Sequence, residues 1–311
     1  MKVFEMDQGK LVSVGEVEAK VGFKCCTFAA SPPGQRHLAT GNFSGSLDIY
    51  DLNALPKPIW SAQGHSSVVN CIDGCGGNGV GAGAAEIVTG GRDGIVKIWD
   101  PRVAEAVVTL EPTVAQAADC WSVAFGNAFN ESERCVAAGY DNGDVKLFDL
   151  RTMTLKWETN IKNGVCHVQF DRKDISMNKL TVSCLESSLR VYDLRTYHPT
   201  EGFACTQQSL EKKSTIWGSH YLPQNREIFA TCVGGGQVYL YKYSYPSQRR
   251  IKDSNDVDIG VAGKLEQLNE RTIASQPIVA YDWHPGKMGL VAMASLDQAL
   301  RVVVCTKLDL Y

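Results

Sequence analysis

The sequence lacks long hydrophobic runs. No stretch approaches the roughly 18 consecutive apolar residues that a membrane-spanning helix needs. The first residues, MKVFEMDQGKLVSV, contain no apolar segment of the length that a secretory signal peptide requires. We therefore expect a chain with no membrane partner and no secretory leader.

A strong excess of either charge is also absent. The 31 lysines and arginines are balanced by 34 aspartates and glutamates, which gives a formal net charge of −3. The basic cluster RRIK at 249–252 is followed by aspartates at 253, 256 and 258. A balanced, interrupted charge pattern argues against a nucleic-acid partner.

Signatures of catalysis and metal binding are missing as well. The six histidines are scattered, and Cys71 and Cys75 do not have the spacing of a zinc-ribbon pair. GCGGNG at 74–79 matches the glycine pattern of dinucleotide sites, but AEIVTG at 85–90 predicts a strand after it, not the helix that would hold a pyrophosphate. We expect no catalytic, metal-binding or cofactor-binding residues, no small-molecule substrate and no enzyme activity.

The 11 cysteines form no disulfide framework. Their number is odd and they are scattered along the chain, apart from the neighbours Cys25 and Cys26 and the pair Cys71 and Cys75. This usage predicts free thiols in a reducing compartment, most of them serving as small buried apolar side chains. We expect a cytoplasmic protein.

A repeat runs through the chain. The string GGRDGIVKIWD at 90–100 ends in Trp-Asp, and worn copies of that ending recur with a period of about 45 residues. The aligned positions are Phe4-Glu5, Tyr50-Asp51, Trp99-Asp100, Phe148-Asp149, Tyr192-Asp193, Tyr241-Lys242 and Val303. The last interval is longer because it contains the polar insertion 246–263, which predicts an exposed loop.

Each repeat unit has the pattern of short strands. Apolar and polar residues alternate at 95–99, 145–148 and 189–192, and turn-forming residues separate these segments at 43–45, 92–94 and 141–143. Strong helical periodicity is absent. Four short strands per unit is typical of a β-propeller blade, so we predict an all-β propeller that forms a single domain over residues 1–311.

The repeat resembles that of the WD-repeat family. In that family a buried hydrogen-bond set joins a His, a Ser or Thr, an Asp and the Trp, and one unit here has each member in place: His65, Thr89, Asp93 and Trp99. The buried indole N–H of a tryptophan needs an acceptor, which such a set supplies. The resemblance implies that this tetrad is structural and not a catalytic triad.

The number of blades has two solutions. Residues 1–6 and 10–18 can be the third and fourth strands of a seventh blade whose first half is missing, as is the closing strand of the last blade. Alternatively, Lys10–Glu18 closes a ring of six blades as the outer strand of the last one. Because Phe4-Glu5 lies in register with Trp99-Asp100, we favour seven blades with an incomplete first blade.

A protein-binding rim is expected on the loops of such a fold. Trp121 and Trp217 stand at the start of the first strand of their units, where they either face solvent as contact residues or pack against a neighbouring blade. By WD-repeat geometry, the same rim includes the position in another unit that corresponds to these tryptophans. It also includes the residues just before the tight-turn Asp position. The candidate rim residues are Phe43, Asn70, Arg92, Trp121, Asp141 and Trp217.

Longer phrases narrow the resemblance. WETNIKNGVCHVQFDRKDISMNKL (157–180), CVAAGYDNGDVKLFDLR (135–151) and EIVTGGRDGIVKIWDPR (86–102) closely resemble the Monad family of WD-repeat proteins, which are dynein axonemal assembly factors. The resemblance implies a cytoplasmic, non-enzymatic scaffold linked to the cilium, whose partners are axonemal dynein heavy chains and prefoldin-like co-chaperone subunits. Family members also carry a further N-terminal segment, so we expect this chain to enter its first blade midway.

A rival function comes from three Asp-x-Arg endings. Arg102, Arg151 and Arg195 each follow the repeat ending by a fixed spacing. A WD-repeat protein with two or more such endings resembles the substrate receptors of cullin-RING ubiquitin ligases, in which the side that carries the arginines contacts an adaptor propeller. The forked guanidinium of arginine suits such contacts. The alternative is that each Arg pairs with its own Asp or with the strand end.

Overall fold

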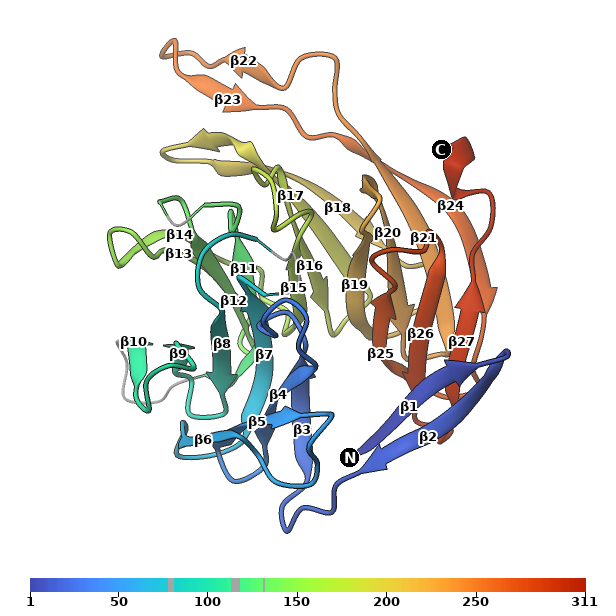
Figure 1. Ribbon diagram of the computed structural model, residues 1–311. Helices are drawn as coiled ribbons and strands as arrows, with labels where there is room; N and C mark the ends of the chain where they lie inside the picture. The colour runs from blue at the N-terminus through green and yellow to red at the C-terminus, as the bar shows by residue number, and fades with distance from the viewer. Residues whose placement is uncertain (78–80, 113–117, 131) are drawn as a thin grey trace. The chain divides into compact units, whose positions relative to one another are not determined.

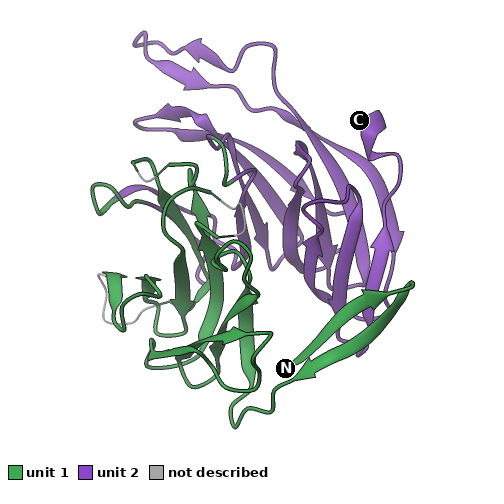
Figure 2. Ribbon diagram, in the orientation of Figure 1, with its two compact units in different colours: residues 1–140, 149–154, 173–175 green, residues 141–148, 155–172, 176–311 purple. Residues whose placement is uncertain are grey.

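The computed structural model describes residues 1–77, 81–112, 118–130 and 132–311 (Figure 1). These residues form 27 strands and one short 3₁₀ helix. The chain divides into two compact units, shown in Figure 2: unit 1 comprises 1–140, 149–154 and 173–175, and unit 2 comprises 141–148, 155–172 and 176–311. The end of the glycine-rich string at 74–79 lies outside the described residues, and a strand follows it as predicted.

Unit 1 contains a hairpin and two four-stranded sheets, followed by the start of a third sheet. The hairpin pairs β1 (Lys2–Asp7) with β2 (Lys10–Glu16). The first sheet has the strands β3 (Phe23–Thr27), β4 (His37–Asn42), β5 (Ser46–Asp51) and β6 (Trp60–Gln63). The second has β7 (Val69–Cys75), β8 (Glu86–Gly91), β9 (Val96–Trp99) and β10 (Ala106–Leu110). In both sheets the spatial order follows the chain.

The chain passes from unit 1 to unit 2 within the sheet of order β11-β12-β13-β14. Its strands are β11 (Cys120–Gly126), β12 (Cys135–Tyr140), β13 (Asp144–Asp149) and β14 (Thr154–Asn160). The next sheet of unit 2 has β15 (Val165–Phe170), β16 (Lys179–Cys184), β17 (Ser188–His198) and β18 (Gly202–Ser209).

The rest of unit 2 holds two more sheets and an inserted hairpin. One sheet has β19 (Ile216–Leu222), β20 (Asn225–Val233), β21 (Gln237–Ser244) and β24 (Lys264–Thr272). The hairpin β22 (Arg250–Lys252) and β23 (Asp258–Gly260) stands between β21 and β24 in the chain. The last sheet has three strands, β25 (Ile278–Trp283), β26 (Leu290–Ser295) and β27 (Leu300–Val304), and the 3₁₀ helix η1 (Leu308–Leu310) follows.

The prediction of seven blades is wrong. The described residues form six sheets of three or four strands, and each of these is a blade. The hairpin β1-β2 is not a seventh, because within its strands all residues but Val3 and Gly15 are exposed, so that it has no buried face. The six-blade alternative differs in one detail: β2, which it assigned to the last blade, is hydrogen-bonded to β1, and the sheet β25-β26-β27 has three strands.

The second strands of the first four sheets explain why these sequences fold as they do. β4, β8, β12 and β16 are buried at nearly every position on both faces. Apart from His37, Asn42, Glu86 and Lys179 at strand ends, their residues are apolar or small: HLATGN, EIVTGG, CVAAGY and KLTVSC. Continuous rather than alternating hydrophobicity is expected for strands covered on both sides. The turn after each of the first three has a glycine with positive φ, at Gly45, Gly94 and Gly143.

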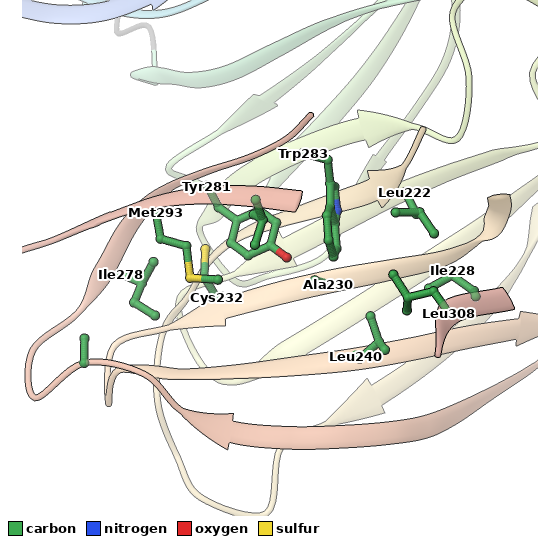
Figure 3. Packing of buried hydrophobic residues seen from close by; sticks show 12 residues of the cluster. Leu222, Ile228, Ala230, Cys232, Leu240, Ile278, Tyr281, Trp283, Met293 and Leu308 are labelled. Atoms are coloured by element: carbon green, nitrogen blue, oxygen red, sulfur yellow. The ribbon is translucent and has the colours of Figure 1, made fainter. Parts of the chain in front are cut away.

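The core lies between neighbouring sheets. In unit 1, Ile87 of β8 and Trp99 of β9 pack with Leu47 and Ile49 of β5. In unit 2, Figure 3 shows Trp283 of β25 beside Tyr281 among side chains from the preceding sheet and η1. The residues labelled there are Leu222, Ile228, Ala230, Cys232, Leu240, Ile278, Tyr281, Trp283, Met293 and Leu308.

All eleven cysteines are free thiols, and only Cys26 is exposed. Burial raises the pKa of several of them, to about 12 for Cys25, Cys75 and Cys232, so these thiols are protonated and unreactive at neutral pH. Within the described ranges, no helix is long and apolar enough to cross a membrane.

Candidate functional site

The tetrad (His65, Thr89, Asp93 and Trp99) is joined by hydrogen bonds in unit 1. Trp99 Nε1 donates to Thr89 Oγ1 at 2.9 Å, and the same hydroxyl lies 2.8 Å from His65 Nε2. His65 Nδ1 lies 3.0 Å from Asp93 Oδ1. The chain of contacts ties the loop before β7 to strand β8, the β8–β9 turn and the end of β9.

The tetrad is a complete donor and acceptor chain. An indole N–H only donates, so Thr89 Oγ1 accepts from Trp99, and its own O–H can donate a hydrogen bond to His65 Nε2 when the ring carries its N–H at Nδ1, facing Asp93. Burial by itself raises the pKa of Asp93, but hydrogen bonds from His65 and from the backbone N–H of Ser66 and Ile95 outweigh it and hold that pKa below its usual value. Asp93 is therefore an anion that fixes the turn.

Burial excludes the tetrad from substrate. His65 is 3% exposed and Thr89 is fully buried, and the Thr89 hydroxyl is already engaged by Trp99 and His65. A nucleophile must reach an external carbon atom, which this hydroxyl cannot do. The arrangement fits a structural role.

A glycine makes the close approach in the tetrad possible. A Cβ added at Gly91 would lie 2.3 Å from both Asp93 Oδ1 and His65 Nδ1. No side chain fits in that space, so Gly91 is required by the tetrad. Its neighbour Gly90 is required by a different contact, because a Cβ there would lie 2.5 Å from Cys120 Sγ and 2.7 Å from Cys71 Sγ.

Four of the six rim residues lie in unit 1. Phe43, in the β4–β5 turn, is 53% exposed and its ring lies over Gly22. Arg92 stands beside Asp93 in the β8–β9 turn, with its side chain exposed and its Nε 3.5 Å from Asp119 Oδ2. Asn70 and Trp121 are half-buried at the starts of β7 and β11, so they present less surface than the other two.

The other two rim residues belong to unit 2. Trp217 of β19 is 38% exposed, and a Cβ at Gly234 would lie 3.6 Å from its Nε1. Asp141 is exposed and precedes Asn142, whose Oδ1 accepts from the backbone N–H of Asp144 in the β12–β13 turn. Trp217 is thus an exposed indole held beside a turn.

The three Asp-x-Arg endings have a local structural explanation. Each Asp accepts a hydrogen bond from the backbone N–H of the Arg two residues later, at 2.9 to 3.0 Å, which closes the turn. Arg102 forms a two-pronged ion pair with its own Asp100, and Arg195 Nε donates to Asn178. Arg151 is exposed.

Sequence reasoning missed a buried ionic cluster in unit 2. The Lys179 ammonium, fully buried at the start of β16, donates to Glu227 and to the Tyr245 hydroxyl, both at 2.8 Å. It also lies 3.4 Å from Asp171, which is paired with Arg226. The one sequence signal for this cluster was the lysine at the start of an otherwise apolar strand, KLTVSC. The same pattern fits a lysine at a solvent-exposed strand end equally well.

A second feature that sequence reasoning missed is a hydrogen bond between the first strands of neighbouring sheets. In unit 1, Asp73 of β7 accepts a hydrogen bond from the Phe125 backbone N–H of β11 at 2.8 Å and is paired with Lys173. In unit 2, Gln169 of β15 accepts from the Tyr221 backbone N–H of β19, also at 2.8 Å. The acceptor lies 52 residues before the donor in both cases. The regular spacing marks a repeated link between sheets.

Among the residues whose placement is known, no group of three or more His, Cys, Asp or Glu side chains could hold a metal ion. The described part of the site therefore offers buried structural contacts and exposed side chains on turns.

Comparison with known proteins agrees with this architecture. Residues 67–216 match a β-propeller family described as Nucleolar protein 10-like, N-terminal domain. A chain in the crystal structure of a mitotic checkpoint complex superposes with a TM-score of 0.73 at 15% identity, covering 98% of this chain and 81% of that one. The designed Ika8 protein gives a TM-score of 0.62 at 16% identity, covering 94% and 74%. The fold is an all-β propeller.

Curated relatives carry a shared name. Proteins named Dynein axonemal assembly factor 10 from Chlamydomonas reinhardtii and Homo sapiens are each 52% identical to this chain, which covers 87% of their length. The protein of that name from Dictyostelium discoideum is 23% identical, with 95% of this chain and 79% of the relative covered. With 52% identity over 99% of its residues, the chain belongs to the dynein axonemal assembly factor 10 family.

Proposed function

We propose that the protein is a non-enzymatic scaffold that helps to assemble axonemal dynein heavy chains in the cytoplasm, together with prefoldin-like co-chaperone subunits. Membership of the family supports the dynein role, because the relatives are named for it. The observation that carries the scaffold role is the set of exposed side chains on turns that buried contacts hold rigid. Phe43 and Arg92 are of this kind, and Trp217 is an exposed side chain at the start of strand β19.

The physical reason is that rigid presentation lowers the entropy lost on binding. Aromatic and arginine side chains are the residue types that dominate binding energy at protein interfaces. Arg92 is adjacent to Asp93, so the tetrad fixes the turn that presents it.

The test is affinity purification from ciliated cells, with mass spectrometry of the partners. Wild-type protein should recover dynein heavy chains and prefoldin-like subunits from the soluble fraction. Arg92→Ala combined with Trp217→Ala should reduce that recovery at least tenfold, whereas the exposed control Met153→Ala, outside the rim, should not. If the rim variant and the control recover the same amounts of these partners, the rim residues do not bind them.

The ligase-receptor alternative has less support, because Arg102 and Arg195 are already engaged within the chain. The same purification separates the two functions. A partner set dominated by ligase subunits and lost on Arg151→Ala would reverse the proposal.

A further inference from the structure

A hollow of about 320 Å³ opens in unit 2 between β14 and the far end of the β17–β18 hairpin. Four aromatic side chains line part of it. Trp157 of β14 meets Tyr192 and Phe203 edge-on, with ring centroids 5.1 Å apart in both pairs. Tyr197 packs against Phe203 at 5.4 Å and remains 49% exposed. None of these residues belongs to the rim or the tetrad.

The hollow contains a guanidinium without a counter-charge. Arg190 of β17 lines it, and the Arg190 Nε is buried with no hydrogen-bond acceptor. Its charge interacts with the Tyr192 hydroxyl and the Cys205 thiol, and burial raises the pKa of both groups, so both are neutral. Among the described residues, no carboxylate forms an ion pair with Arg190.

A buried N–H donor without an acceptor is unfavourable, and a ligand that supplies the missing acceptor to Arg190 Nε removes that cost. A carboxylate has the geometry that a guanidinium binds best. The two acidic residues at the hollow, Glu158 and Glu201, disfavour a ligand with more than one negative charge; Glu158 lies 3.7 Å from Lys146, and Glu201 is exposed.

We propose that this hollow binds a single carboxylate carried by a partner protein, on either an acidic side chain or a C-terminus, with an adjoining apolar side chain packed against Trp157 and Tyr197. The volume suits one or two residues of an extended segment. This site is independent of the proposed dynein role and of the rim.

The test is a titration of the full chain by NMR, which follows the Nε–H signal of Arg190, with three probes. Acetyl-Phe-Glu-amide carries a side-chain carboxylate, acetyl-Phe-Ala with a free C-terminus carries a terminal one, and acetyl-Phe-Gln-amide is neutral. At least one acidic probe should bind roughly tenfold more tightly than the neutral one, because hydrogen bonds between charged groups are the stronger ones. The acidic probe that binds identifies the source of the carboxylate.

Four variants sharpen the result. Arg190→Gln should abolish the preference for acid, and Tyr197→Ala, an exposed position that leaves the fold intact, should weaken all three probes together. Glu201→Gln should tighten the acidic probes, since it removes a like charge. Arg195→Gln, on the same strand but outside the hollow, should change nothing.

Three outcomes would overturn the proposal. One is equal binding of acidic and neutral probes, and another is binding of none of them. The third is tighter binding of acetyl-trimethyllysine-amide that Glu201→Gln weakens, which would make the aromatic side chains a cage for cations.

Discussion

At the scale of single residues, Thr89 is the centre of the tetrad. Thr89→Val keeps the volume but leaves the Trp99 N–H and a His65 ring nitrogen without partners. We expect the free energy of unfolding to fall by about 2 to 4 kcal/mol, measured by chemical denaturation. The matched control is Thr40→Val, since Thr40 is equally buried on β4 but makes one long bond to the Asp48 carbonyl, 3.3 Å. Equal losses for the two variants would contradict the account.

His220 of β19 is expected to make the stability of the folded protein depend on pH. Burial first, and then the charge of His167, hold the pKa of His220 well below its ordinary value of 6.5, so the folded state keeps this imidazole neutral. Below pH 6.5 the unfolded chain binds the proton more readily, so stability falls as pH falls, by up to about 1.4 kcal/mol per pH unit, and this dependence fades about one pH unit above 6.5.

The measurement for His220 is the melting temperature between pH 7.5 and 5.5. The wild type should lose stability through this window, and His220→Gln should flatten the curve. His284→Gln, at an exposed position, should leave the slope unchanged. A slope that survives in His220→Gln would show that another group is responsible.

The tetrad could be predicted from the sequence because its four members stand at fixed positions in one repeat unit. Lys179 and Arg190 could not, because what distinguishes them is their surroundings. Lys179 is paired with Asp171, just after β15, and with Glu227 of β20, whereas Arg190 lacks an ionic partner. A pattern of residue types along one strand does not reveal which groups face it.

At the scale of elements, the insertion 246–263 is more ordered than an exposed loop. It forms the hairpin β22-β23, and Arg249 at its base makes a two-pronged ion pair with Asp193, which is fully buried on β17. The guanidinium also lies 4.5 Å from the ring centroid of Tyr245. The sequence showed the charges of the insertion but not the buried carboxylate that receives one of them.

Arg249→Gln should therefore release the hairpin. Hydrogen exchange of the amides at 250–260 should accelerate roughly tenfold or more, because charge-assisted hydrogen bonds contribute about 1.5–3 kcal/mol. Lys252→Gln is the control, since Lys252 pairs with Asp258 inside the hairpin. Exchange rates that are equal in the two variants would mean that Arg249 does not hold the insertion.

The first hairpin shows a limit of pattern reading at the same scale. Phe4-Glu5 is in register with Trp99-Asp100, yet Phe4 is 43% exposed and Trp99 is 2% exposed. Register predicted the strands β1 and β2 correctly, but a blade also requires a neighbouring face that covers it. Only the structure supplies that information, which is why the predicted number of blades was too high.

At the scale of the whole molecule, the protein is an all-β propeller, and we propose that it binds other proteins through the exposed side chains of the rim. The single-domain organisation over residues 1–311 stays a prediction, as does the rim. Both follow from the repeat, because the β4–β5, β8–β9 and β12–β13 turns stand at equivalent positions of successive units. We expect Phe43→Ala to weaken partner binding while leaving the melting temperature within about 1 °C of wild type, since an exposed side chain contributes little to stability.

The most direct measurement is photo-crosslinking in ciliated cells. A benzoylphenylalanine placed at Phe43 or Trp217 reports which protein touches the rim, and one at the exposed Leu155 of β14 serves as the control. The account predicts crosslinks to dynein heavy chains or prefoldin-like subunits from Phe43 and Trp217 and none from Leu155. Crosslinks to these partners from Leu155 alone, or to unrelated proteins from the rim, would contradict it.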